Sequence, residues 1–211
     1  MKKQIVIAAL IAAFAACFAA PAQAQETPNF AQFLAQFPKA DLPFSLTAED
    51  LTAQLAPGAP RVKRLGWDFY GFLPELKRSA QYSNMPVYPE PVAAFETENY
   101  YAVLYNIARG LGKGAKSYSM SIYDKNGAYI GTNFVAGINA ETLTTVTINA
   151  NLEAIVTEYD AVRVIGEGDV RIEYKNRKGS IQLDLTIPGN PDQIEWSAAG
   201  ALTTENIAAS R

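Results

Sequence analysis

Histidine is absent from the 211-residue chain, and its only cysteine is Cys17. Without histidine the chain cannot form a Ser-His-Asp triad or a Cys-His nucleophile pair. Zinc and haem sites built on His or Cys are excluded as well, and a chain with a single cysteine cannot form an internal disulfide. Carboxylates remain as the only numerous candidates for general acid or base, and we expect no metal and no cofactor.

The chain also lacks a cluster of basic residues, and its formal net charge is −3. An acidic balance of this kind argues against nucleic acid and anionic membrane surfaces as partners.

Residues 1–24 have the layout of a secretory signal peptide. Lys2 and Lys3 precede an apolar run from Ile5 to Ala20, and the small-residue site Ala22-Gln23-Ala24 follows. The run is shorter than the roughly 20 apolar residues of a membrane-spanning helix. We therefore expect an exported protein, periplasmic or extracellular, with no transmembrane segment in the mature chain. Loss of the two lysines moves the formal charge to −5.

Cys17 offers an alternative to cleavage after Ala24. The sequence Phe14-Ala15-Ala16-Cys17 resembles a bacterial lipobox, although Phe stands where Leu is usual and Phe18 follows the cysteine. Lipid attachment at Cys17 would make the protein a lipid-anchored structural lipoprotein of the envelope.

Residues 25–211 are expected to form one β-rich domain, since this length suffices for one substantial core. The pattern divides it into a helical lead-in (25–60), an aromatic and proline-rich segment (61–98), an antiparallel meander (99–197) and a frayed tail (198–211). The fold class predicted is mainly β (α+β): an antiparallel β-meander sheet, in a sandwich or a barrel, with one or two short N-terminal helices.

Two short helices are predicted in the lead-in. Thr27-Pro28 suggests an N-cap with proline at the first helical position, and an apolar stripe then ends at Pro38. The second helix is expected over residues 48–55, with Thr47 as its N-cap and Asp50 three residues later.

The meander is centred on a hairpin, Ser117–Ala136, whose Asn126-Gly127 turn favours type I′ geometry. The preceding strand, residues 99–109, is apolar on both sides and is expected at the centre of the sheet. Further strands are predicted over residues 143–148, 153–159 and 162–174. A second hairpin is predicted at 174–181, where the sequence YKNRKGSI echoes YDKNGAYI.

Three patterns in the sequence resemble functional motifs only weakly. The loop GLGKGAKS (110–117) nearly matches a phosphate-binding pattern, but Ala115 replaces a required glycine and a strand is expected to follow. Asp124 and Asn126 lack the further ligands of a calcium loop, and the turn accounts for both. A glycosidase would need two facing carboxylates, such as Glu158 with Glu167.

The candidate site is the aromatic segment, because flat rings stack on sugar faces and bind partners. Its residues could equally plug one end of the fold. The predicted ligand-binding residues are Trp67, Phe69, Tyr70, Phe72, Tyr82 and Tyr88.

The stretches NYYAVLYNIA, YSMSIYDKNGAYIG and TVTINANLEAIVTEYD together resemble exported β-rich proteins of Gram-negative bacteria that have no assigned activity. The resemblance spans residues 99–187 and implies no site. The sequence therefore predicts an exported, non-catalytic binding or envelope-associated module for a glycan, a peptide or another envelope protein. The alternatives are a carboxylate-dependent hydrolase of envelope polysaccharide and a structural lipoprotein.

Overall fold

The computed structural model describes residues 27–54, 62–76, 88–108, 116–166 and 169–187. The predicted signal peptide, Cys17, the loop at 110–115 and the tail at 198–211 lie outside these residues. The elements in chain order are α2 (Phe30–Leu34), β1 (Phe44–Leu46), α3 (Ala48–Ala53), the 3-10 helix η1 (Trp67–Phe72), β2 (Tyr88–Glu96), β3 (Tyr100–Ala108), β4 (Lys116–Asp124), β5 (Tyr129–Ile138), β6 (Thr142–Ile148), β7 (Glu153–Gly166) and β8 (Asp169–Asp184).

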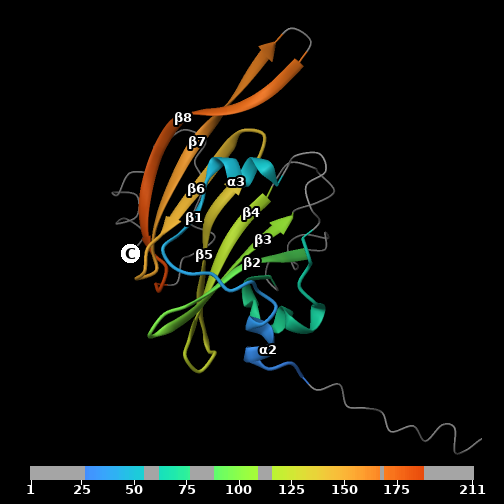
Figure 1. Ribbon diagram of the computed structural model, residues 1–211, viewed down its shortest axis with the longest axis vertical. Helices are drawn as coiled ribbons and strands as arrows, with labels where there is room; N and C mark the ends of the chain where they lie inside the picture. Colours follow the sequence, from blue (N-terminus) through green and yellow to red (C-terminus); the bar gives the residue numbers. More distant parts are fainter. Residues whose placement is uncertain (1–26, 55–61, 77–87, 109–115, 167–168, 188–211) are drawn as a thin grey trace, which may run out of the picture.

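The strands form one antiparallel sheet of eight, in which β2 to β8 are neighbours in sequence order and β1 pairs with β6. The strand direction turns progressively from β2 to β8 (Figure 1), as expected from the twist of β-sheets. The described strands β2 and β8 end the path and are not paired with each other, so the sheet is open. The predicted antiparallel meander with short N-terminal helices is thus confirmed, whereas the described strands form one open sheet in place of the predicted sandwich or barrel.

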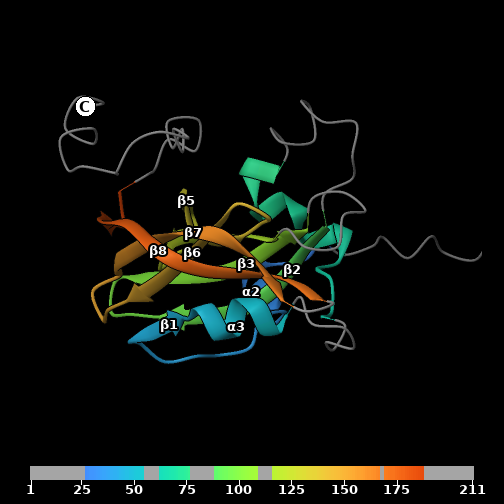
Figure 2. The same cartoon turned by 90° about the horizontal axis from the view of Figure 1, so that it is seen from above.

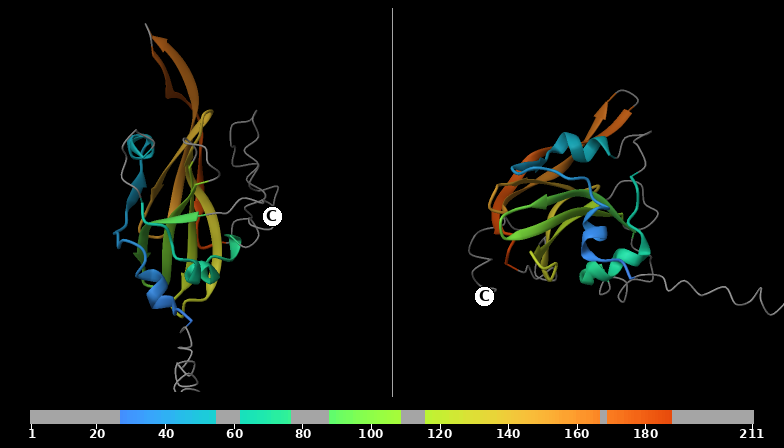
Figure 3. Two further views of the ribbon diagram at one scale, coloured as in Figure 1. Left: turned by 90° about the vertical axis from the view of Figure 1, so that its right-hand side faces the viewer. Right: turned by 60° about the horizontal axis from the view of Figure 1, so that its bottom comes forward.

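Both faces of the central strands are covered. One face carries the larger core, which includes Leu104, Met120 and Val146 and extends from β2 to β8. The sheet curves around this core (Figure 3), and β1 and α3 lie against it. On the opposite face, Tyr105 and Tyr123 pack with residues of α2 and η1. Figure 2 shows α3 and η1 on opposite sides of the sheet.

The hairpin of β4 and β5 is confirmed, but its turn is not type I′. Only Gly127 has a positive φ, of 82°, whereas type I′ geometry requires positive φ at Asn126 as well. The Asp124 carboxylate instead accepts hydrogen bonds from the N–H groups of Asn126 and Ala128, each at 2.8 Å. Strand β4 is also buried on both faces, since Ser121 and Tyr123 are as inaccessible as Met120 and Ile122.

The predicted second hairpin at residues 174–181 is wrong. This stretch lies inside the continuous strand β8, whose pairing with β7 continues on both sides of it. Register shifts opposite Glu158–Ala161 accommodate the polar residues of β8 without a reversal of the chain. The strand predicted over 162–174 is therefore divided between β7 and β8, which form a long ribbon that projects from the sheet (Figure 1).

The N-terminal helices are shorter than predicted. The N-cap of α2 is Asn29 instead of Thr27, and its side chain forms a capping box with Gln32. The predicted Thr47 cap of α3 is confirmed, because Thr47 and Asp50 form a capping box as well. None of the helices in the described ranges has the length and apolar character needed to cross a membrane.

Strand β2 lies at the edge of the sheet and contains Pro89 and Pro91, in agreement with the confinement of proline to edge strands. Other parts of the chain occupy its outer side. Ala94 and the segment 38–40 exchange backbone hydrogen bonds of 2.7 and 3.0 Å, and the Leu65 N–H donates to the Pro89 carbonyl at 2.8 Å. The outer backbone groups of β2 are thus partly satisfied within the chain.

We expect Gly127→Ala to destabilise the protein by about 2 kcal/mol. Alanine is strained at a φ of 82°, and its Cβ would lie 2.7 Å from Cγ of Phe30 in α2. Urea denaturation measures this change. Gly71→Ala is the matched control, because no atom lies within 4 Å of the added Cβ and the change should stay within about 0.5 kcal/mol. Equal stabilities of the two variants would contradict the assigned turn geometry.

Candidate functional site

The 3-10 helix η1 separates its aromatic residues into two pairs. A 3-10 helix has three residues per turn, so side chains three apart lie on the same side. Trp67 and Tyr70 form one such pair, and Phe69 and Phe72 form the other. The sequence WDFYGF therefore places Phe69 and Phe72 against the core, and leaves Trp67 exposed with Tyr70 half-buried beside it.

The inner pair attaches η1 to α2 and the sheet. Phe72 stacks on the buried ring of Phe33 with 4.9 Å between centroids, and Phe69 lies 6.4 Å from the same ring. The hydroxyl of Tyr123 on β4 donates a 2.6 Å hydrogen bond to the Phe72 carbonyl. This bond holds the end of η1 in a defined position on the sheet.

The outer pair forms an aromatic platform, defined here as Arg64, Trp67, Tyr70 and Tyr88. Trp67 is 66% exposed and stacks on Tyr70, with centroids 4.8 Å apart and an angle of 28° between the rings. Tyr88 lies edge-on to Trp67 at 5.9 Å, and the Arg64 guanidinium lies 4.4 Å from the Tyr88 ring centroid. The indole thus has an exposed surface and support from two tyrosines.

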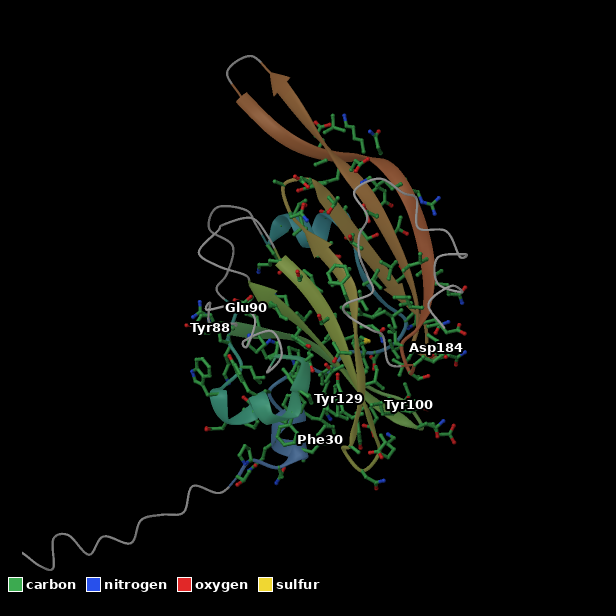
Figure 4. The ribbon with its side chains drawn as sticks, turned by 180° about the vertical axis from the view of Figure 1, so that it is seen from behind. Phe30, Tyr88, Glu90, Tyr100, Tyr129 and Asp184 are labelled. Atoms are coloured by element: carbon green, nitrogen blue, oxygen red, sulfur yellow. The ribbon has the colours of Figure 1, made fainter. Side chains whose placement is uncertain are left out.

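The platform sits at the edge of the sheet, at the start of β2 (Figure 4). Buried Leu65 fixes this position, because its N–H donates to the carbonyl of Pro89 on β2. The bond ties the chain between Arg64 and Trp67 to the residue after Tyr88. The geometry of the platform therefore depends on backbone contacts and does not rest on surface side chains alone.

The predicted site residues fall into three groups. Trp67, Tyr70 and Tyr88 lie together in the platform, and Phe69 and Phe72 pack against the core beneath η1, which Tyr70 also contacts. Tyr82 lies outside the described residues. Sequence reasoning missed Arg64, for which the only signal was a cationic residue three positions before the exposed tryptophan.

A buried carboxyl, Glu75, follows η1 and lies against the same face of the sheet. Its Oε1 accepts hydrogen bonds from the hydroxyls of Tyr105 and of Ser121, the latter at 3.3 Å, while its Oε2 is buried without a hydrogen-bond partner. Ser121 in turn bonds Thr132 at 2.6 Å, and Thr132 accepts from Tyr129 at 2.9 Å. A continuous set of hydroxyls thus links Glu75 to Tyr129, which is 37% exposed.

Burial raises the pKa of Glu75, and hydrogen bonds from Tyr105 and Ser121 oppose this only in part. Burial also raises the pKa of Tyr105 well above the ordinary value for tyrosine, with Glu75 as a further cause. A carboxyl that retains its proton can act as a general acid. The described groups that act on its pKa are hydroxyls and its own backbone, whereas a glycosidase uses two carboxylates roughly 5–10 Å apart.

The other chemical candidates have structural roles in the described residues. Glu158 is paired with Lys178 at 3.3 Å, and Glu167 lies outside the described residues. The Asp124 carboxylate accepts two backbone hydrogen bonds in the turn at Gly127. Within the described ranges, no three His, Cys, Asp or Glu residues are grouped so that they could hold a metal ion.

The chain matches no protein-family model, and neither curated proteins nor solved structures include a match. Its function therefore has to be inferred from the geometry of its own residues.

Glu75→Gln should flatten the dependence of stability on pH. Because the folded state raises the pKa of Glu75 above 4.5, protonated Glu75 contributes stability below pH 4.5 that is lost as the pH rises further. Glutamine retains an oxygen acceptor for Tyr105 and cannot ionise, so its free energy of unfolding should fall less steeply above pH 4.5. Urea denaturation at a series of pH values measures the two slopes.

Glu96→Gln is the control for this comparison. Glu96 is exposed, and its hydrogen bond from Lys125 lowers its pKa, so its contribution has the opposite sign. The variant should retain the wild-type decline above pH 4.5. If the free energy of unfolding depended on pH equally in the wild type and in Glu75→Gln, Glu75 would have the same pKa in the folded and the unfolded state.

Proposed function

We propose that the protein is an exported, non-catalytic binding module that recognises a glycan through the aromatic platform. The observation that carries this proposal is the exposure of Trp67, a residue that is 66% exposed although its ring stacks on Tyr70. Export is part of the proposal and rests on the signal-peptide layout of residues 1–24.

An exposed indole of this kind suits a sugar ring. The C–H groups on one side of a pyranose form a flat apolar surface that stacks on an aromatic face, and burial of both surfaces is favourable. Tyr70 and Tyr88 restrict the orientation of Trp67 before the ligand arrives, which reduces the entropy lost on binding. Arg64 adds N–H donors, which sugar hydroxyls accept, at the side of Tyr88.

The hydrolase alternative has less support. Its strongest candidate acid, Glu75, lies in the segment after η1 with its carboxyl buried against the sheet, and its described hydrogen-bond partners are hydroxyls. A retaining or inverting glycosidase needs a second carboxylate roughly 5–10 Å from the first. Binding without turnover requires only the platform.

Trp67→Ala is expected to weaken glycan binding at least about thirtyfold, which corresponds to the loss of about 2 kcal/mol at a central binding residue. The ligand is first identified on a glycan array with the mature chain, and affinities are then measured by isothermal titration calorimetry. Thermal unfolding should change little, since Trp67 lies outside the core.

Ile155→Ala serves as the matched control, because Ile155 is a similarly exposed apolar residue, at 53%, on the distant strand β7. Its affinity should equal that of the wild type. Wild-type affinity in Trp67→Ala, or an array without any bound glycan, would refute the proposed function. A bound peptide or protein partner in place of a glycan would do the same.

A further inference from the structure

Arg64 is the cationic member of the aromatic platform. Its guanidinium lies 4.4 Å from the Tyr88 ring centroid, and the residue is exposed. Burial raises the pKa of Tyr70, with Tyr88 as a further cause, and the charge of Arg64 opposes this, so Arg64 is close to both tyrosines. A cation–π contact uses the charge of a guanidinium and leaves N–H groups available for other partners. Arg64 therefore presents hydrogen-bond donors and a positive charge next to the tyrosines that support Trp67.

A second cation–π contact in the structure shows what Arg64 lacks. Lys125 Nζ lies 4.2 Å from the ring centroid of Tyr101, and the Glu96 carboxylate pairs with it at 2.9 Å. None of the carboxylates in the described part of the chain forms an ion pair with Arg64. The positive charge of Lys125 is thus compensated within the chain, whereas the described residues leave that of Arg64 uncompensated.

The chain around the platform has a surplus of positive charge. Residues 55–89 contain five of the 18 basic residues and only two of the 21 acidic residues, Asp68 and Glu75. The carboxyl of Glu75 is buried against the sheet, and Asp68 is exposed. The three-residue period of η1 places Asp68 with Gly71, on a different side from Trp67. The net charge of −3 for the whole chain conceals this local surplus.

An uncompensated guanidinium beside an aromatic surface specifies the chemistry of a ligand. A carboxylate accepts two parallel N–H bonds from a guanidinium, and such charge-assisted bonds are stronger than bonds to neutral hydroxyls. A uronic acid carries this carboxylate on a sugar ring whose C–H groups can stack on an indole. Because Tyr88 contacts both Trp67 and the Arg64 guanidinium, the indole and the cation belong to one surface.

We propose that the aromatic platform binds an acidic glycan, in which the carboxylate of a uronic acid pairs with Arg64 while a sugar ring stacks on Trp67. This inference rests on the proposed function and adds the charge class of the glycan. A neutral glycan would leave the charge of Arg64 uncompensated, whereas a uronate compensates it. Lys63, which is exposed beside Arg64 in sequence, adds to the attraction. Acidic residues farther away than roughly 10 Å oppose it little at 0.1 M salt.

The test compares hexagalacturonate and hexamannuronate with their methyl esters, which have the same sugar rings without the charge. Calorimetric titration of the mature chain should give at least about tenfold tighter binding for the acid than for its ester. Arg64→Gln should weaken binding of the acid by a similar factor and abolish this preference, while binding of the ester stays unchanged. Arg64→Lys keeps the charge and loses the bidentate geometry, so it should recover part of the affinity.

Lys125→Gln is the matched control, because it also removes a cation that lies over a tyrosine ring, at the other end of β2. Its affinity and its preference for the acid should equal those of the wild type. Since Arg64 is exposed, Arg64→Gln should leave the melting temperature unchanged. Raising NaCl from about 50 to about 500 mM should weaken binding of the acid in the wild type and have a smaller effect in Arg64→Gln.

The outcomes separate this inference from the proposed function. Equal binding of acid and ester, or binding of neutral glycans alone, would overturn the inference, and loss of that binding in Trp67→Ala would still support the platform as a glycan site. An unchanged preference for the acid in Arg64→Gln would show that another group binds the carboxylate, which also overturns the inference. Affinity lost in Arg64→Gln but retained in Trp67→Ala would refute the aromatic platform and leave only the charge pair. The absence of binding to any glycan would refute both proposals.

Discussion

The burial of the central strands on both faces is the constraint on which the rest of the structure depends. In β3 and β4, Leu104 and Met120 point into one core while Tyr105 and Tyr123 point into another. A sheet with two apolar faces must be covered on both, because each exposed aliphatic or aromatic side chain would forgo roughly 1.5–3 kcal/mol of burial. The N-terminal segment supplies both covers, β1 with α3 on one face and α2 with the chain leading to η1 on the other.

Hydroxyl groups on the second face give that cover a defined orientation. Apolar contacts are not directional, so the phenylalanines of α2 and η1 alone would tolerate several arrangements. Tyr123 and Tyr105, by contrast, carry buried hydroxyls that must find partners, and they bond the Phe72 carbonyl and the Glu75 carboxyl on either side of Leu73. Two directional bonds so close in sequence fix the end of η1, and the outward position of Trp67 follows from that placement.

The sequence predicted those features that depend on local pattern or on strand alternation. Thr47 with Asp50 specified a helix start. The two-sided apolar pattern of residues 99–109 predicted a strand at the centre of the sheet, and β3 is an interior strand buried on both faces but lies next to the edge strand β2. The sequence pattern gave a wrong prediction where pairing with another strand determines the local structure. Residues 174–181 include residue types that are common in turns, but pairing with the adjacent strand β7 keeps them extended. The division of the aromatic segment was also hidden, since the three-residue period of η1 is obscured by nearby prolines and glycines. Asn106 looked like one polar residue in an apolar strand, and only the structure shows that its buried amide has no hydrogen-bond partner among the described residues.

The edge of β2 explains why side chains, and not the backbone, are suited to recognition here. A peptide that binds by strand addition needs a row of free N–H and C=O groups along a sheet edge. Pro89 and Pro91 have no N–H to offer, the Pro89 carbonyl is bonded to Leu65, and Ala94 is paired with the segment 38–40. The Tyr88 side chain of the same strand is differently placed, because it contributes to the exposed platform. An edge that is largely closed to strand addition but carries an exposed aromatic platform is suited to recognition through side chains.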